Sequence, residues 1–311
     1  MGRLEAVAAP LIALVGPTAA GKSAVALRLA RELGGEIVSC DSLQVYRGLD
    51  IGSAKATAEE RASVPHHLLD VVDPDALFSA AEYARLARAA VADIAGRGRL
   101  PIVAGGTGLY LRALLFGLFA GPARDERFRA RLAAFAARRG GARLHRLLAR
   151  VDPESAARIA PADEVRVVRA LEVFRATGQP LGAHHRGGAP ALEGFRAHVV
   201  GIAPPRDVLR AAVVRRTDEM LARGLLAEVR GLLDRGYAPD LRPLQAIGYR
   251  QAVEVVLGRR DEAAARRDIV ASTMQYAKRQ LTWFRHQTDA SWSETADGAF
   301  ADALRARDAA S

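Results

Sequence analysis

The chain has 311 residues, half of them hydrophobic and about a quarter charged. This length is enough for one large domain or two ordinary ones, and the composition is that of a globular protein and not of a disordered one. No apolar run reaches the roughly 18 residues that a membrane span needs. The single cysteine, Cys40, excludes an internal disulfide and a cysteine-rich zinc site. A net charge of +10 points to a polyanionic partner. We expect a cytoplasmic protein without membrane contact.

The first 120 residues alternate apolar runs with helical segments. Helices are predicted over 22–33 and from a Ser79–Glu82 capping box to about Ala95. Alternation of this kind indicates an α/β fold, a parallel sheet with helices on both faces. Three short apolar runs predict the buried strands: Leu11–Val15, Glu36–Cys40 and Leu100–Ala104.

The composition changes after Gly121. Between Gly121 and Pro190 the chain holds 14 arginines, no lysine and seven acidic residues, a net charge of +7. Helical spacing over 125–150 and 163–177 is followed by a predicted loop at 182–190 and a strand at 197–203. We therefore expect a basic, mostly helical domain at 121–194, inserted into a core formed by 1–120 and 195–311.

Helices dominate the rest of the chain. Their spacing predicts helices at 207–223, 225–235, 250–257 and 261–288. The last dozen residues are expected to form a frayed tail.

Residues 16–23, GPTAAGKS, fit the phosphate-binding pattern GxxxxGK[ST] and lie between a strand and a helix. In such a P-loop the backbone N–H groups and the helix N-terminus bind an anion. Lys22 adds a point charge, and the Ser23 hydroxyl is placed to ligate Mg²⁺. The pattern is that of nucleotide- and ATP-binding proteins. The predicted diphosphate site is Gly16, Pro17, Thr18, Ala19, Ala20, Gly21, Lys22 and Ser23.

An ATPase or GTPase would carry an acidic residue after a further strand. The strand at 100–104 is followed instead by Gly105, Gly106 and Thr107. A small-molecule kinase stays open, because Asp41 follows the second strand as in many such enzymes. A non-catalytic RNA-binding protein would explain the charge, although not a complete P-loop beside Asp41.

Seven segments in order resemble the tRNA dimethylallyltransferase (tRNA isopentenyltransferase) family over nearly the whole chain. The resemblance implies a P-loop NTPase-like core with an inserted helical domain. It also implies transfer of a dimethylallyl group from dimethylallyl diphosphate to N6 of the adenosine 3′ to the anticodon in tRNA. The segments are GPTAAGKS (16–23), DSLQVYRGLDIGSAK (41–55), PHHLLDVVDP (65–74), GGTGLY (105–110), RALEVF (169–174), QAIGYRQ (245–251) and KRQLTWFR (278–285).

The resemblance also assigns catalytic roles. Asp41 matches the general base that accepts the amino proton, and Thr18 matches the threonine that contacts the departing bridging oxygen. Asp41 could alternatively cap a helix or hold a Mg²⁺-bound water. Arg216 matches an arginine near the diphosphate, with a solvated helix face as the equal alternative.

The tRNA contacts implied by the resemblance begin at Asp41 and include Gln44, whose amide could pair with a purine edge. Core packing stays open for Leu43 and Phe284, and His145, His184 and His185 are expected on the surface or facing RNA. We expect a monomer. The implied contact residues are Asp41, Ser42, Leu43, Gln44, Thr107, Val165, Arg166, Val167, Val168, Arg169, Gln245, Ala246, Ile247, Gly248, Tyr249, Arg250, Lys278, Arg279, Gln280, Leu281, Thr282, Trp283, Phe284 and Arg285.

Only three of the 45 basic residues are lysines. A chain that uses arginine wherever either cation serves is expected to keep lysine where a compact ammonium is needed. We expect this need at Lys22 and Lys278. The question stays open for Lys55, because Ser53 and Ala56 beside it depart from the family pattern.

Overall fold

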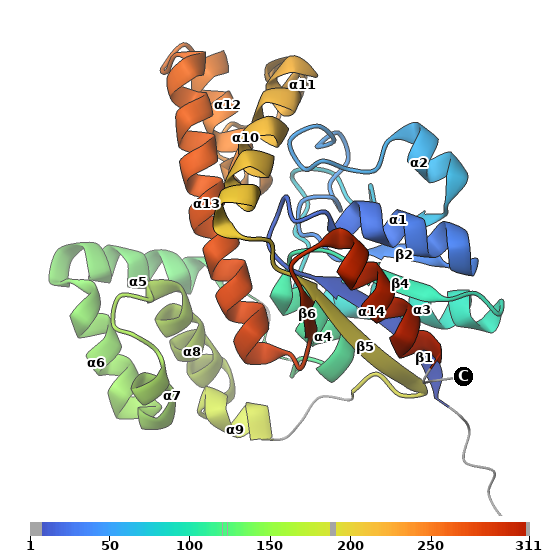
Figure 1. Cartoon of the computed structure of the whole chain (residues 1–311). Coiled ribbons are helices and arrows are strands. Elements are labelled where there is room, and N and C mark those ends of the chain that lie inside the picture. Colours follow the sequence, from blue (N-terminus) through green and yellow to red (C-terminus); the bar gives the residue numbers. More distant parts are fainter. Residues whose placement is uncertain (1–7, 120, 123, 187–190, 309–311) are drawn as a thin grey trace, which may run out of the picture. The chain divides into compact units, whose positions relative to one another are not determined.

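The computed structural model describes residues 8–119, 121–122, 124–186 and 191–308 (Figure 1). The described chain divides into two compact units. The larger unit comprises the residues up to Leu115 and those from Leu192 onward, and the smaller unit runs from Phe116 to Ala191. No helix in the described ranges is both long enough and apolar enough to cross a membrane.

The larger unit is built on a six-stranded parallel sheet, which confirms the predicted fold class. Two edge strands, β3 and β6, were not predicted, because runs of two and three residues carry no periodic pattern. The order is β3-β2-β4-β1-β5-β6. The bounds are β1 Ala9–Val15, β2 Glu36–Ser39, β3 His66–His67, β4 Pro101–Ala104, β5 Phe195–Ile202 and β6 Ser291–Ser293.

Strand β1 lies in the middle of the sheet, between β4 and β5, and buries side chains on both faces. Leu11 and Val15 join one hydrophobic core, whereas Ile12 and Leu14 join the other. Because successive side chains of a strand point to opposite faces, an uninterrupted apolar run is what such a strand requires.

Helices cover both faces of this sheet. Helices α1 (Lys22–Leu33) and α14 (Ala296–Asp308) lie together against one face (Figure 1). Residues of several helices, the long helix α13 among them, fill the hydrophobic core on the other face of the sheet. The remaining elements of the unit are α2 Ala58–Ser63, α3 Ala80–Gly96, α4 Gly108–Phe116, α10 Arg206–Ala222, α11 Leu225–Asp234, η1 Arg242–Gln245, α12 Tyr249–Val256 and α13 Glu262–Gln287.

One local prediction was wrong and another holds in part. The expected frayed tail is largely helix α14, whose Phe300 and Ala303 are buried against α1, because these apolar residues fall on one helical face. The capping box of α3 is half formed. Ser79 Oγ accepts the Glu82 N–H at 3.1 Å, but the Glu82 carboxylate pairs with Arg85 instead of returning to the cap.

The smaller unit is helical and has its own hydrophobic core, which includes Leu144, Leu148, Val167 and Ala170. The helical stretch predicted over 125–150 is interrupted at Gly140, whose φ of +82° favours glycine. The helices are α5 Glu126–Arg139, α6 Gly141–Val151, α7 Pro153–Arg158, α8 Glu164–Thr177 and α9 Leu181–Arg186.

The loop expected at 182–190 is wrong for its described part, which belongs to α9. The first N–H of this helix, from Leu181, donates to the buried carboxylate of Asp152 at 2.8 Å. The same carboxylate caps α7 through the Ser155 N–H at 3.0 Å. This contact joins residues about 30 positions apart, so no local pattern predicts it. Residues 187–190 lie outside the described residues.

Candidate active site

The P-loop connects the end of β1 to the start of α1. Gly16 has a φ of +136°, and a Cβ on it would lie 2.3 Å from the carbonyl oxygen of Ile202 in β5. Only glycine therefore lets the chain leave the central strand this close to its neighbour. Gly21, in the left-handed conformation, then sets up the first turn of α1 at Lys22.

The Lys22 side chain is buried, and its Nζ donates to the carbonyl oxygen of Pro17 at 2.7 Å. Burial, with the positive charge of Arg216, lowers the pKa of Lys22 to about 8, although Asp41 acts in the opposite direction. Among the described residues this buried cation is hydrogen-bonded only to its own loop, so it is poised to gain from an incoming anion.

A cavity of about 810 Å³ adjoins the P-loop. Its lining includes the predicted residues Thr18, Lys22, Ser23, Asp41 and Arg216. The structure thus brings together the P-loop, the carboxylate after β2 and a cation from α10, which are as much as 198 residues apart in the sequence.

Arg216 does not lie on a solvated helix face, which was the alternative for this residue. Burial lowers its pKa, opposed by the carboxylates of Asp41 and Glu219. Among the described residues its guanidinium forms no hydrogen bond or ion pair. The buried Lys22 and the partly buried Arg216 therefore both line a cavity that is suited to a multiply charged anion.

The carboxylate of Asp41 is held by the chain that follows it. Its Oδ1 accepts the N–H of Leu43 at 2.8 Å, and the neighbouring N–H of Ser42 donates to Thr107 Oγ1 at 3.0 Å. No helix begins at Asp41, so the helix-cap alternative is wrong. One carboxylate oxygen fixes the turn, and within the described chain the other forms no hydrogen bond.

The amide of Gln44 is fully used within the protein. Its Oε1 accepts the Ser39 hydroxyl at 2.7 Å, and its Nε2 donates to the carbonyl oxygens of Ser53 and Ala54, both at 3.2 Å. Because both of its donors have protein partners in this conformation, only the amide oxygen keeps capacity for a further hydrogen bond, and pairing with a purine edge stays a prediction.

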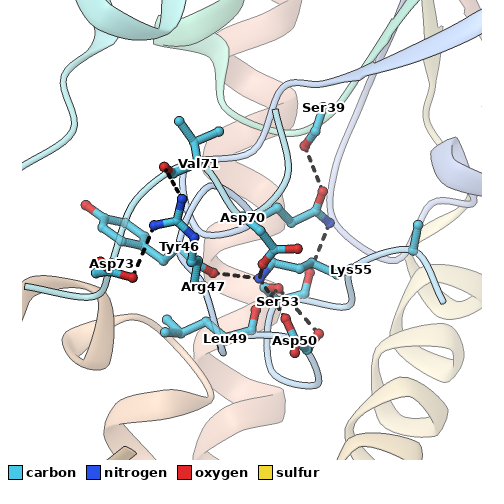
Figure 2. A network of polar contacts seen from close by, with 12 residues as sticks. Ser39, Tyr46, Arg47, Leu49, Asp50, Ser53, Lys55, Asp70, Val71 and Asp73 are labelled. Carbon is cyan, nitrogen blue, oxygen red and sulfur yellow. Dashed lines mark hydrogen bonds and ion pairs between the residues drawn. The ribbon is translucent and has the colours of Figure 1, made fainter. Parts of the chain in front are cut away.

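Lys55 lies at the centre of the network in Figure 2, where its side chain points toward Asp50 and Asp70. Nζ donates to the Tyr46 carbonyl oxygen at 2.6 Å, to Asp50 Oδ1 at 2.7 Å and to Asp70 Oδ1 at 2.6 Å. The side chain is 1% exposed. Three acceptors around one buried nitrogen match an ammonium and leave no room for a guanidinium, which answers the question left open for Lys55.

Glu228, on α11, is a structural residue that the sequence did not reveal. Its carboxylate accepts the N–H groups of Asp50, Ile51 and Gly52 at 2.9, 2.7 and 3.3 Å, and the hydroxyl of Tyr249 at 2.7 Å. A single glutamate on an amphipathic helix carries no signal of such a role. Together, Glu228 and Lys55 hold the segment that follows Asp41.

Comparison with known proteins now decides the family. The IPP transferase family model matches residues 44–287. The chain is 49% identical over 283 residues to a tRNA dimethylallyltransferase from Solibacter usitatus, with 91% of this chain and 92% of the relative covered. It is 50% identical over 284 residues to one from Geobacter metallireducens, with 91% and 92% covered. The chain belongs to the IPP transferase family.

Solved structures agree with this assignment. The crystal structure of a tRNA isopentenylpyrophosphate transferase from Bacillus halodurans is similar with a TM-score of 0.70 and 38% identity, over 97% of both chains. A eukaryotic dimethylallyltransferase captured acting on tRNA is similar with a TM-score of 0.76 and 26% identity, over 91% of this chain and 73% of that one. This IPP transferase therefore has the fold of its solved relatives.

Of the RNA contacts implied by the resemblance, some side chains are accessible and others are in the core. Val167, Tyr249 and Phe284 are at most 1% exposed, so their side chains pack the interior and have almost no surface for RNA in this conformation, which for Phe284 is the alternative left open. Gln280 is also buried. The exposed residues are Val165, Arg166, Gln245, Arg250, Lys278, Arg279, Thr282 and Arg285.

Two cations of this set differ from expectation. Arg169 donates to the buried carboxylate of Glu172 at 2.6 Å, so a protein anion already neutralises it. Lys278 is exposed and has no partner among the described residues, so nothing in this structure requires lysine there.

The structure describes the side chains of two of the three histidines. The His145 ring contacts the carbonyl oxygens of Ala156 and Ile159 at 3.0 and 2.8 Å, so it is an internal contact. His184 stacks on Phe119 with ring centroids 5.1 Å apart. The side chain of His185 lies outside the described residues.

Proposed function

We propose that this IPP transferase moves a dimethylallyl group from dimethylallyl diphosphate to the exocyclic N6 of the adenosine 3′ to the anticodon in tRNA. The observation that carries the proposal is the meeting of P-loop, Lys22, Arg216 and Asp41 in one cavity, in a chain whose relatives are named tRNA dimethylallyltransferases. Such a substrate implies work in the cytoplasm, and we propose that the protein acts there as a monomer.

In this reaction the N6 nitrogen attacks the allylic carbon, a C–N bond forms, and the bond from that carbon to the bridging oxygen breaks. The leaving diphosphate takes the electron pair and stays in the P-loop. Lys22 and Arg216 stabilise the charge that it gains, because preorganised cations in a partly dry site cost no reorganisation as the bond breaks. The Thr18 hydroxyl, at the cavity wall, donates to the departing bridging oxygen.

Asp41 accepts the proton that N6 loses. The adenine amino group is a poor nucleophile because its lone pair is delocalised into the ring, so removal of its proton as the bond forms is a real advantage. The carboxylate oxygen not engaged by the Leu43 N–H is the one available for this task. The Leu43 contact keeps the carboxylate oriented, which a general base needs.

The residues fit a Mg²⁺ ion that enters with the diphosphate. No cluster of three or more His, Cys, Asp or Glu side chains suited to a metal occurs in the described part of the chain. Mg²⁺ is commonly held by one or two protein oxygens together with substrate phosphates, and the Ser23 hydroxyl lines the cavity. When bound, the ion would neutralise charge on the diphosphate.

One assay tests the proposal. The protein is incubated with radiolabelled dimethylallyl diphosphate and unmodified tRNA, and the label is expected in the tRNA. It should be absent when the target adenosine is replaced by guanosine. Labelled phosphate transfer from ATP to a small metabolite, with no labelled tRNA, would favour the kinase alternative. Tight tRNA binding without transfer would leave a non-catalytic RNA-binding protein.

A further inference from the structure

Gln280, on α13, bridges two loops of the candidate active site. Its Oε1 accepts the N–H of Thr18 in the P-loop at 2.9 Å, and its Nε2 donates to the carbonyl oxygen of Gly106 at 2.8 Å. In the sequence, Gln280 lies 262 positions from Thr18 and 174 positions from Gly106. Because a backbone N–H must donate and a carbonyl must accept, only one orientation of the amide satisfies both partners.

The space around this amide is closed. Gln280 is 6% exposed, and a Cβ on Gly106 would lie 2.2 Å from its Nε2. Three residues further along α13, the Trp283 ring packs on Gly108, where a Cβ would be 2.3 Å away. One face of α13 thus fits against the loop at 105–108, and Gln280 is the polar contact of that face.

These contacts are incompatible with a direct role of Gln280 in RNA binding. Both polar groups of its side chain already have protein partners, and the side chain has almost no surface. On the same helix, Lys278 and Thr282 are exposed and free for such contacts. The structure calls for a different role for Gln280, inside the protein.

We propose that Gln280 is a positioning residue that sets the orientation of Thr18 relative to the leaving diphosphate. The proposal rests on the proposed function, in which the Thr18 hydroxyl meets the bridging oxygen. The bond to the Thr18 N–H fixes the backbone from which this hydroxyl projects. A displacement of a reacting group by about 1 Å can cost about a hundredfold in rate.

The kinetic test compares Gln280→Ala with Thr18→Ala and the double variant. Gln280→Ala is expected to lower the turnover number about ten- to hundredfold while the Kd for tRNA stays within about twofold. In the Thr18→Ala background, the same change should cost less than about threefold, because residues that act through one another are not additive. Gln275→Ala, at an exposed position of the same helix, is the matched control and should leave both quantities unchanged.

Two outcomes would overturn the proposal. A fivefold or larger rise in the Kd for tRNA at unchanged turnover would make Gln280 an RNA contact. An equal loss with and without the Thr18 hydroxyl would show that Gln280 acts independently of it. If Gln280→Ala does not fold, Gln280→Met keeps the size of the side chain, removes both hydrogen bonds and is subject to the same criteria.

Hydrogen exchange supplies a readout that needs no catalytic activity. The Thr18 amide should exchange at least tenfold faster in Gln280→Met than in the wild type, whereas amides within α1 should keep their rates. An unchanged Thr18 rate would refute the contact itself. If the wild type transfers no prenyl group to tRNA, the proposed function fails, yet this measurement still decides whether Gln280 holds the P-loop.

Discussion

At the scale of single residues, Asp41 and Lys22 illustrate how one side chain combines two tasks. Asp41 holds its own turn through the Leu43 N–H, and its other oxygen has no hydrogen-bond partner among the described residues. Lys22 is bonded to the Pro17 carbonyl oxygen within the loop that it serves. In both cases the contact that orients the group leaves its charge available to a substrate.

Asp41→Asn is expected to bind tRNA nearly as the wild type does and to lose about 10²- to 10⁴-fold in turnover, the usual contribution of a general base. The asparagine side-chain oxygen can still accept the Leu43 N–H, so the turn should persist. Single-turnover rates and a tRNA binding isotherm measure the two quantities separately. Turnover within about threefold of the wild type would mean that water or another residue takes the proton.

Lys22 should make anion binding dependent on pH. Because its pKa is about 8, below the ordinary lysine value, the side chain is charged below pH 8 and loses its proton above it. Binding of inorganic pyrophosphate above pH 8 must then take up a proton, and affinity should fall by up to about tenfold per pH unit. The matched Lys22→Met variant reports the pH dependence that comes from the titration of pyrophosphate itself. Equal slopes of log affinity against pH for the two proteins would contradict the expectation.

Lys22→Arg should bind pyrophosphate almost as poorly as Lys22→Met, because a guanidinium does not replace a compact ammonium.

At the scale of elements, the segment from Asp41 to Lys55 has no helix or strand of its own, yet it is held on two sides. Glu228 binds three successive N–H groups of this segment, and Lys55 binds one of its carbonyl oxygens and the Asp50 carboxylate. The Asp70 carboxylate connects the network to the chain that follows α2. Figure 2 shows the contacts of the Lys55 ammonium with Tyr46, Asp50 and Asp70.

Lys55→Met should destabilise the larger unit by about 1–3 kcal/mol, less than the 3–5 kcal/mol of a fully buried pair, because Asp50 and Asp70 are partly exposed. Burial alone would raise the pKa of Asp70, but hydrogen bonds from Lys55 and Arg61 hold this pKa below 3.8. The stabilisation is therefore fully present above pH 3.8 and is lost as the pH falls through the lowered value. Urea unfolding at pH 7 and near pH 3 measures the difference.

One control replaces Lys55 by arginine, and a second makes the same change at the exposed Lys278. Lys55→Arg should lose stability comparably, because the guanidinium does not fit among the three acceptors, whereas the exposed Lys278→Arg should not. A stable Lys55→Arg variant would show that the network tolerates either cation.

At the scale of the whole molecule, positive charge is concentrated in the smaller unit. Some of its arginines are already paired: Arg129 and Arg169 both bind the buried Glu172, and Arg166 lies 3.3 Å from Asp163. Others on α5 and α6, namely Arg139, Arg143 and Arg146, are exposed and unpaired among the described residues. We propose that this second group contacts RNA phosphates.

Replacing Arg139, Arg143 and Arg146 by glutamine should weaken tRNA binding and reduce the slope of log K against log[salt] by up to about 2.7, at roughly 0.9 for each duplex-like phosphate contact. Binding of dimethylallyl diphosphate should not change, because the P-loop belongs to the larger unit. The control removes three arginines from helices that cover the sheet, Arg31, Arg85 and Arg305, and should leave the slope unaltered. An unchanged slope in the folded α5–α6 variant would move the RNA surface elsewhere, first to Lys278–Arg285.

The sequence alone determined features that depend on neighbours along the chain. The P-loop, the apolar run of β1 and the bounds of α1 and α8 follow from residues within one or two turns of one another, so local pattern predicts them. The basic insertion and Asp41 beside the P-loop were visible for the same reason. The resemblance to the family rested on the order of seven motifs along the chain, which composition alone does not show.

The tertiary structure decided which face each side chain presents and what it meets there. Gln44 and Gln280 look alike in sequence to amides free to bind RNA, but both ends of each amide have protein partners, which lie within ten positions of Gln44 and on distant loops for Gln280. Arg169 is paired with Glu172, three positions further along the same helix, whereas Arg143 has no partner among the described residues. Which partner each group takes depends on the three-dimensional course of the chain, and a buried polar group takes a partner that folding brings within about 3 Å, because leaving it unpaired would cost several kcal/mol.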